Sequence, residues 1–209
     1  MKKLIFMLSL LIGVSSLSFS IDKTKEKLLA KQFKTKLKSL AKDGWEISGT
    51  SRTLEVALYE HYEKLKMPDY TELSGEVSNC ISINVCRQTA LNNAILYYAQ
   101  QASSFLKARV AGDQQINSTA VGSEFDKVYT AYERLVAAEI KGEIEESFSI
   151  VRKNGDVKEY KTFFLVNEKK AGEKRLRALE NAFKETSVAQ EYAKKISEFV
   201  KEGFETEAK

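Results

Sequence analysis

The sequence predicts an α+β fold: a single domain in which a small antiparallel sheet is packed by several amphipathic helices. Several segments place apolar residues at helical spacing, and two runs of β-favouring residues flank an Asn-Gly pair. No stretch is rich enough in glycine or proline to separate two domains, and 209 residues with 43% hydrophobic and 30% charged residues are ordinary for one globular protein. We expect the helices to lie mainly on one face of the sheet.

Residues 1–20 have the three parts of a secretory signal peptide. Two lysines follow Met1, an apolar run extends from Leu4 to Val14, and serines occupy positions 18 and 20, which a signal peptidase reads. The alternative, a membrane anchor or a buried helix, is disfavoured because a bilayer-spanning helix needs roughly 20 apolar residues. No cysteine lies near the predicted cleavage point, so we expect a soluble, exported protein that is not a lipoprotein.

The mature chain is predicted to begin near Ile21 with a basic amphipathic helix over residues 21–43. Its apolar residues recur at steps of four, four and three residues, which puts them on one face, while lysines fill most of the other positions. Such a face can lie on an anionic membrane surface, bind a partner or pack on the protein's own core. The face consists of Leu29, Phe33, Leu37 and Leu40.

The single domain is predicted to occupy residues 44–209, and its first part alternates helices with short extended pieces. Gly44 ends the basic helix, Pro68 ends the next one, and Trp45 is expected to anchor the core. Alanines at helical spacing in the long third helix would let a second element approach closely. The expected elements are an extended piece over 45–49, a helix over 52–67, a strand over 70–80, a helix over 84–110, a loop over 111–122 and a helix over 123–140 capped by Ser123.

A β-hairpin over residues 143–167 is the clearest β signal. Asn154-Gly155 lies between two apolar runs, and both residues of that tight turn must adopt positive φ. The second strand is apolar on both sides and is therefore expected to be central, and a long C-terminal helix over 168–203 follows it. The residues expected to share a face in the first strand are Ile144, Phe148 and Ile150.

Cys80 and Cys86, the only two cysteines, are the sharpest local feature. Export to an oxidising compartment favours a disulfide between them, which would clamp the junction of the predicted strand and the long helix. Two buried thiols or a redox pair are the alternatives, and the spacing lacks the Cys-x-x-Cys pattern of redox pairs. One histidine and two cysteines argue against a zinc site rich in these residues.

No catalytic motif, phosphate loop, dinucleotide-binding glycine pattern or metal-binding loop occurs in the sequence, so we expect no cofactor and no metal. His61 lies beside glutamates on a predicted helix and is expected to be solvated or half-buried. An enzyme would need a cleft in which polar groups on or beside the alanine-rich helix converge. Besides glutamates, those groups are Arg87, Asn92, Asn93 and Arg109.

Three stretches of the sequence resemble a group of uncharacterised exported proteins of Gram-negative bacteria: Gly44–Gly49, Ser82–Ala90 and Phe163–Val166. More distantly, residues 44–200 are similar to the small outer-membrane lipoprotein family related to flagellar outer-membrane assembly factors. The resemblance implies an α+β fold and a periplasmic or outer-envelope location, and it implies no catalytic residues. The chain departs from those lipoproteins because it has no cysteine placed to accept a lipid.

We therefore expect a non-enzymatic envelope protein that acts through contacts with another envelope protein or with itself. One alternative is a periplasmic module that binds a small ligand or lipid, because 9 tyrosines and 11 phenylalanines could line a pocket. Another is an enzyme with a site that the sequence does not reveal. Residues 22–43 could also contact a membrane surface. A nucleic-acid partner is not expected, because the net charge is only +4 and falls when the signal-peptide lysines leave.

Overall fold

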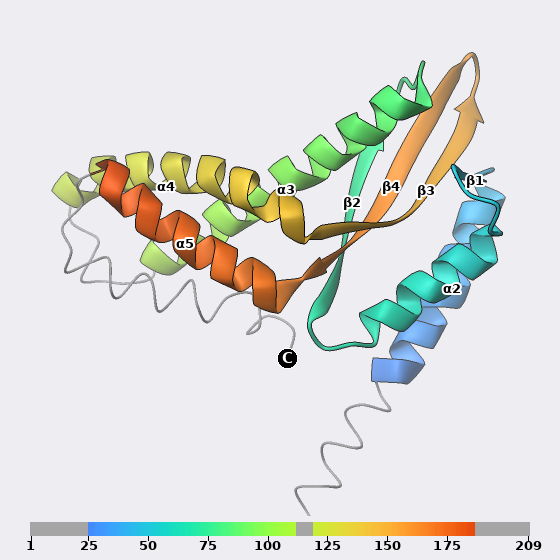
Figure 1. The fold of residues 1–209 in the computed structure, drawn as a ribbon, viewed down its shortest axis with the longest axis horizontal. Coiled ribbons are helices and arrows are strands. Elements are labelled where there is room, and N and C mark those ends of the chain that lie inside the picture. Colours follow the sequence, from blue (N-terminus) through green and yellow to red (C-terminus); the bar gives the residue numbers. More distant parts are fainter. Residues whose placement is uncertain (1–24, 112–118, 187–209) are drawn as a thin grey trace, which may run out of the picture.

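The computed structural model describes residues 25–111 and 119–186, and these have the α+β architecture that the sequence predicts (Figure 1). The predicted signal peptide and the end of the predicted C-terminal helix lie outside the described residues. No helix in this described part is long and apolar enough to cross a membrane. The elements in chain order are a helix over 25–42, β1 (Glu46–Ser48), α2 (Leu54–Leu65), β2 (Tyr70–Val77), α3 (Ile83–Ala111), α4 (Thr119–Glu139), the short 3-10 helix η1 (Ile140–Glu143), β3 (Ile144–Asn154), β4 (Val157–Asn167) and α5 (Glu168–Thr186).

Within the described residues, four strands form one antiparallel sheet in the order β1-β3-β4-β2. β3 and β4 form the predicted hairpin, and Gly155 in its turn has a φ of 62°, a conformation that residues with side chains rarely adopt. β4 lies inside the sheet between β3 and β2, as its two apolar sides predict. The short β1 pairs with Ser149–Val151 of β3.

A β-bulge in β3 changes which residues of this strand point to the same side of the sheet. Before the register shift, Ile144 pairs with Val166, and after it Phe148 pairs with Phe163. Ile144 therefore packs with the cluster on one side of the sheet, whereas Phe148 belongs to the cluster on the other side. The predicted common face is wrong for Ile144, because one extra residue inverts the alternation of side chains along a strand.

Helices cover both faces of the sheet, so the expectation of one covered face is wrong. α3 packs on the side that carries Phe164 and Val166. The helix over 25–42 and α2 pack on the opposite side, around Phe148 and Phe163. The reason lies in β4, whose residues Phe163 to Val166 are all buried, and an apolar surface on each side of a strand requires a cover on each side.

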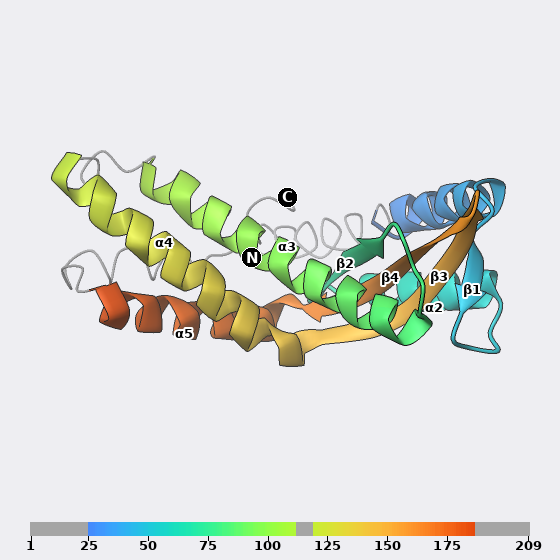
Figure 2. The same cartoon turned by 90° about the horizontal axis from the view of Figure 1, so that it is seen from above.

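The helices α3, α4 and α5 extend past the sheet and pack against one another (Figure 2). Buried alanines of α3, among them Ala94, Ala99 and Ala102, let α4 come close. α4 begins at Thr119, so the predicted loop over 111–122 is too long, and Ser123 lies inside the helix instead of capping it. α5 begins at Glu168, where the sequence places it.

A buried polar network joins the first turns of α5 to α3 and β2. Nη1 of Arg175 donates to the carboxylate of Glu168 at 2.7 Å and also to the hydroxyl of Tyr98. That hydroxyl donates to Glu168 at 3.2 Å, and Thr71 donates to the other carboxylate oxygen at 3.0 Å. Only 6% of the Arg175 side chain and 14% of the Glu168 side chain are exposed. Burial raises the pKa of Tyr98, which keeps its hydroxyl protonated and able to donate.

β2 and α3 make a very close backbone approach at Gly75 and Ala90. A Cβ atom placed on Gly75 would lie 1.8 Å from the carbonyl oxygen of Ala90. The alanine spacing of α3 predicts that a second element can come close, and the structure confirms it for β2 at Ala90 as well as for α4 further along the helix. The glycine that weakens this strand by propensity is thus required by its packing.

Candidate functional site

The outer side of α3 carries no charge over most of its length. From Gln88 to Leu106 the helix contains no Asp, Glu, Lys or Arg, although 30% of the chain is charged. Its inner side is fixed by buried alanines and by larger buried residues such as Ile95. The exposed residues of this stretch are Gln88, Asn92, Asn93, Leu96, Tyr97, Gln100, Gln101 and Ser104. These residues are called the uncharged face below.

Hydrogen bonds hold several side chains of the uncharged face in place. Gln88 Nε2 donates to Asn92 Oδ1 at 3.1 Å, one turn further along the helix. Gln101 Nε2 donates to the Tyr97 hydroxyl at 2.9 Å. Asn93 Nδ2 donates to a backbone carbonyl of β2 at 2.9 Å. The face therefore presents ordered amide and hydroxyl groups, which can both donate and accept hydrogen bonds.

Leu96 and Tyr97 lie at the centre of the uncharged face and are 52% and 53% exposed. Protein–protein interfaces are depleted of charged residues at their core and enriched in aromatic residues, especially tyrosine. A helix face in permanent contact with water ordinarily carries charges of both signs. The uncharged face shares with interface cores the absence of charge and an exposed tyrosine at its centre, although six of its eight residues are polar.

The four polar residues considered for a catalytic cleft do not converge. Arg87 forms an ion pair with Glu146 of β3 at 2.6 Å, at the start of α3. Arg109 lies near the other end of the helix, about 33 Å from Arg87 along its axis. Asn92 and Asn93 lie between the two arginines and belong to the uncharged face. In the described ranges 25–111 and 119–186, no group of three or more His, Cys, Asp or Glu side chains could hold a metal ion.

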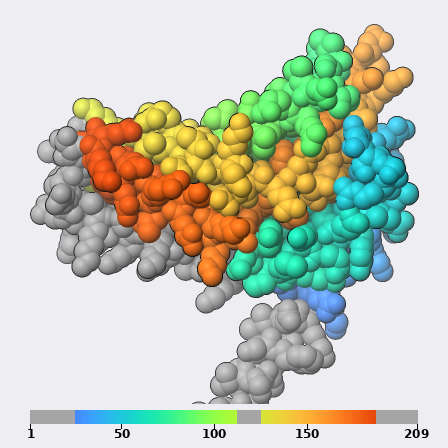
Figure 3. Space-filling model, viewed as in Figure 1, coloured from blue at the N-terminus to red at the C-terminus, as the bar shows by residue number. Residues whose placement is uncertain are grey.

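Cys80 and Cys86 form the predicted disulfide, with Cα atoms 5.7 Å apart. Both residues are buried, and the backbone N–H of Cys80 donates to the carbonyl of Lys158 at 2.7 Å. This hydrogen bond joins the turn that the disulfide closes to the hairpin of β3 and β4. The turn and the tip of the hairpin project from the same side of the molecule (Figure 3). On the turn, Ile81 is 94% and Val85 64% exposed. The disulfide therefore fixes the start of α3 and, with it, one end of the uncharged face.

Removing the disulfide with Cys80→Ala and Cys86→Ala together should lower the free energy of unfolding by about 2 kcal/mol, the chain-entropy value for so short a loop. Urea denaturation of the oxidised proteins measures the difference. Reductant should destabilise the wild type by a similar amount and leave the double variant unchanged. Equal denaturation midpoints for the oxidised wild type and the double variant would show that the disulfide contributes nothing to the free energy of unfolding.

The apolar side of the helix over 25–42 faces α2 and the sheet. The sequence allows three uses of this face, and the structure shows that most of its residues pack on the protein's own core. Leu40 is buried, and Phe33 and Leu37 pack against the cluster that contains Phe163. Leu29 is half-buried at the edge of this contact. Contact of residues 22–43 with a membrane or a partner stays a prediction.

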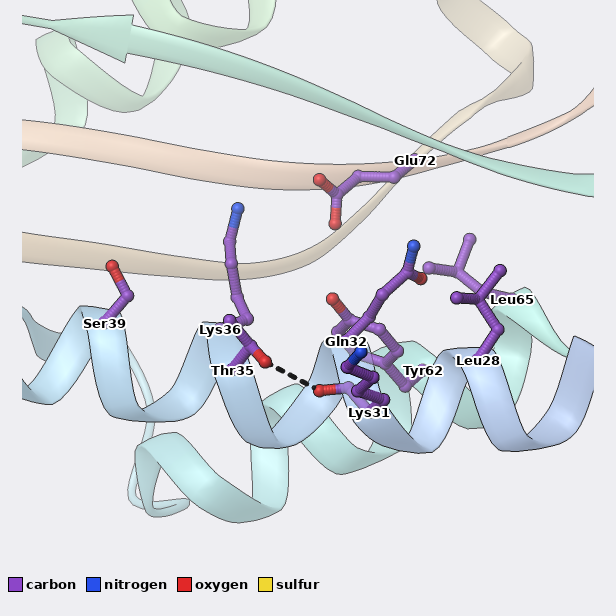
Figure 4. Close-up of a pocket in the computed structure, with 9 residues that line it drawn as sticks. All are labelled: Leu28, Lys31, Gln32, Thr35, Lys36, Ser39, Tyr62, Leu65 and Glu72. Carbon is purple, nitrogen blue, oxygen red and sulfur yellow. Dashed lines mark hydrogen bonds between the residues drawn. The ribbon is translucent and has the colours of Figure 1, made fainter.

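A groove of about 590 Å³ lies between the helix over 25–42, α2 and β2 (Figure 4). Glu72 projects into it from β2, and Lys36 projects toward the same space from the helix (Figure 4). Ligand pockets in proteins have volumes of this order. The residues that line the groove are Leu28, Lys31, Gln32, Thr35, Lys36, Ser39, Tyr62, Leu65 and Glu72.

His61 lies behind the groove and is fully buried, so the expectation of a solvated or half-buried side chain is wrong. Its ring contacts Phe148 and Phe163, and its Nε2 donates to Glu72 Oε2 at 2.9 Å. Burial by itself would raise the pKa of Glu72, but the hydrogen bond from His61 and the nearby lysines lower it below its usual value. Glu72 is therefore ionised at neutral pH and presents a fixed negative charge to the groove.

Comparisons of the chain with protein-family models, with curated protein sequences and with solved structures found no match. The resemblance to exported Gram-negative proteins thus stays a prediction, and the candidate sites rest on geometry.

Neither the uncharged face nor the groove is among the sites that the sequence predicts. The first could have been found, because the gap in charge between Arg87 and Lys107 is visible in the sequence. The groove depends on how three separate elements pack, and the amino-acid pattern of each element gives no sign of it.

Proposed function

We propose that the chain is an exported protein of the cell envelope that acts by binding another protein through the uncharged face of α3. The proposal contains no catalytic step. The observation that carries it is the absence of charge from Gln88 to Leu106 on a helix whose outer side is exposed.

Charged side chains on exposed helices keep a protein soluble. A helix face without them is unfavourable for solubility unless another surface covers it in the functional state. The helix over 25–42 and α5 follow this rule, because their outer positions are filled with lysines and glutamates. The uncharged face, from Gln88 to Ser104, spans about 24 Å of α3. A partner that removes this surface from water accounts for its composition, and Leu96 and Tyr97 would supply the apolar and aromatic contacts at its centre.

The partner surface should itself be uncharged, because a charge placed against these amides would lose its water without meeting an opposite charge. The uncharged face of a second copy meets this requirement, since amide and hydroxyl groups both donate and accept hydrogen bonds. A two-fold axis through the contact would place Leu96 and Tyr97 of the two copies near each other. A second copy is therefore the first partner we expect.

The envelope part of the proposal is supported by the disulfide, which is compatible with an oxidising exported compartment. The pattern of residues 1–20 and the resemblance to exported proteins predict the same location. Mass analysis of the native protein tests it, since cleavage near Ile21 is expected. An intact Met1 terminus on a cytosolic protein would contradict it.

A photo-crosslinking amino acid in place of Tyr97 tests the contact in the native envelope. We expect one crosslinked product of defined mass, equal to two chains for a second copy and to a different mass for another protein. The matched control carries the same amino acid in place of Thr130, which is exposed on α4. No product from the first position, or equal products from both positions, would contradict the proposal.

A charge on the uncharged face should weaken the contact. Leu96→Glu places a carboxylate at an exposed position, so the fold should be kept, while the crosslinked product should fall about tenfold because the charge loses water in the contact. Thr130→Glu, in a chain that carries the crosslinker at position 97, is the matched control and should leave the product unchanged. Undiminished crosslinking in the Leu96→Glu chain would rule out this face as the contact.

A further inference from the structure

The groove between the helix over 25–42, α2 and β2 carries positive charge without an ion-pair partner (Figure 4). Lys31 and Lys36 line it, and neither forms an ion pair with any carboxylate in the described part of the chain. Glu72 lies on the opposite wall, where it accepts a hydrogen bond from His61 at 2.9 Å and where Lys36 stabilises its charge, so it offsets only one of the two lysines. The groove can therefore gain from one negative charge that the protein does not supply.

Lys36 is the lysine best placed to receive that charge. Its side chain is half-buried, and its Nζ lies 5.0 Å from the centroid of the Phe163 ring. Lys161 places a second ammonium 5.2 Å from the same ring, but that ammonium already pairs with Glu76. An ammonium that has lost part of its water gains more from an anion than one on the open surface. Further lysines along the same helix add positive potential around the groove.

The other end of the groove is apolar. Leu28 and Leu65 face each other there beside the ring of Tyr62 (Figure 4). Leu28 is 54% exposed, so it has apolar surface that a ligand could cover. Lys36 follows Leu28 by two helical turns, which separates the charged and apolar ends by about 12 Å. A short methylene chain that ends in an anionic group matches both ends at once.

We infer that this groove binds a fatty acid, with the carboxylate at Lys36 and the acyl chain against Leu28 and Leu65. Glu72 restricts the ligand, because its negative charge on the facing wall repels every anionic headgroup and repels a doubly charged one about twice as strongly as a carboxylate. The site lies on the helix over 25–42 and not on α3, so it is independent of the protein contact proposed above.

Isothermal titration calorimetry of the mature protein with decanoate, kept below its micelle concentration, tests the inference. Decanoate should bind, and decanol, which has the same chain without the charge, should bind much more weakly. Lys36→Met keeps the length of the side chain and removes its charge, so decanoate binding should weaken about tenfold. Lys34→Met removes an exposed lysine of the same helix outside the groove and should leave binding unchanged.

Glu72→Gln separates the electrostatic effect from a folding defect. Gln keeps an acceptor for His61 and removes the opposing charge, so decanoate should bind more tightly, a gain that partial unfolding cannot produce. Four results would overturn the inference: no binding of decanoate, equal binding of decanol, unchanged binding by Lys36→Met, or no gain with Glu72→Gln.

Discussion

Gly75→Ala will lower the free energy of unfolding by about 3 kcal/mol, at the upper end of the usual cost of overpacking. The new Cβ atom would lie 1.8 Å from the carbonyl oxygen of Ala90 and 2.6 Å from its carbonyl carbon. These are backbone atoms of α3, so they cannot rotate away as a side chain would. Either β2 or α3 must shift, although buried residues such as Leu73 and Ala94 hold both in the core. Equilibrium unfolding in urea measures the loss.

Gly142→Ala is the matched control for this substitution. A Cβ atom at Gly142 meets nothing within 4 Å, and the residue does not have positive φ. Its free energy of unfolding should therefore change by no more than about 0.5 kcal/mol. Equal losses for the two variants would mean that the close approach of β2 and α3 does not cause the effect.

Glu168→Gln will lower the free energy of unfolding by about 3 kcal/mol, because it removes the carboxylate that faces a buried guanidinium. Arg175 and Glu168 are 2.7 Å apart with 6% and 14% of their side chains exposed. The substitution also removes a negative charge from the first turn of α5, where the helix dipole favours it. Thermal and urea denaturation of the variant measure the loss.

Two further variants decide whether the charge is the cause. Glu185→Gln breaks the exposed ion pair between Arg134 and Glu185, and it should cost little because exposed pairs contribute little. Glu168→Leu combined with Arg175→Met removes both charges and should recover much of the stability lost in Glu168→Gln. If Glu168→Gln lowers the free energy of unfolding no more than Glu185→Gln does, the buried pair contributes no more to stability than the exposed pair.

The elements of the fold that depend on local chemistry could be predicted from the sequence. The turn at Gly155, the helix end before Pro68 and the disulfide between Cys80 and Cys86 all follow from residue type and spacing. The two helix-covered faces of the sheet could have been predicted as well. A central strand that is apolar on both sides already requires them, and the expectation of one covered face overlooked this consequence.

Features that depend on contacts between distant elements could not be predicted. The bulge in β3 leaves no trace in the alternation of residues, and it moves Ile144 to the other side of the sheet. His61 has glutamates close to it in the sequence, but it follows Leu58 by three positions and precedes Leu65 by four, so helical spacing already places it on the apolar side of α2. The aromatic rings of β3 and β4 that enclose it come from distant parts of the chain. Its partner Glu72 comes from β2, so the hydrogen bond cannot be seen in the helix alone.

The bulge has a consequence for how molecules of this protein can meet. β1 covers three residues of β3, and the remaining outer edge of this strand could offer backbone groups to a strand of another molecule. The bulge interrupts that row, Arg52 already donates to the Ser147 carbonyl at 3.1 Å, and charged residues at Glu145 and Lys153 flank it. Irregular, charged edges of this kind oppose strand-to-strand polymerisation. The outer edge of β3 is therefore a poor template for the growth of a fibre.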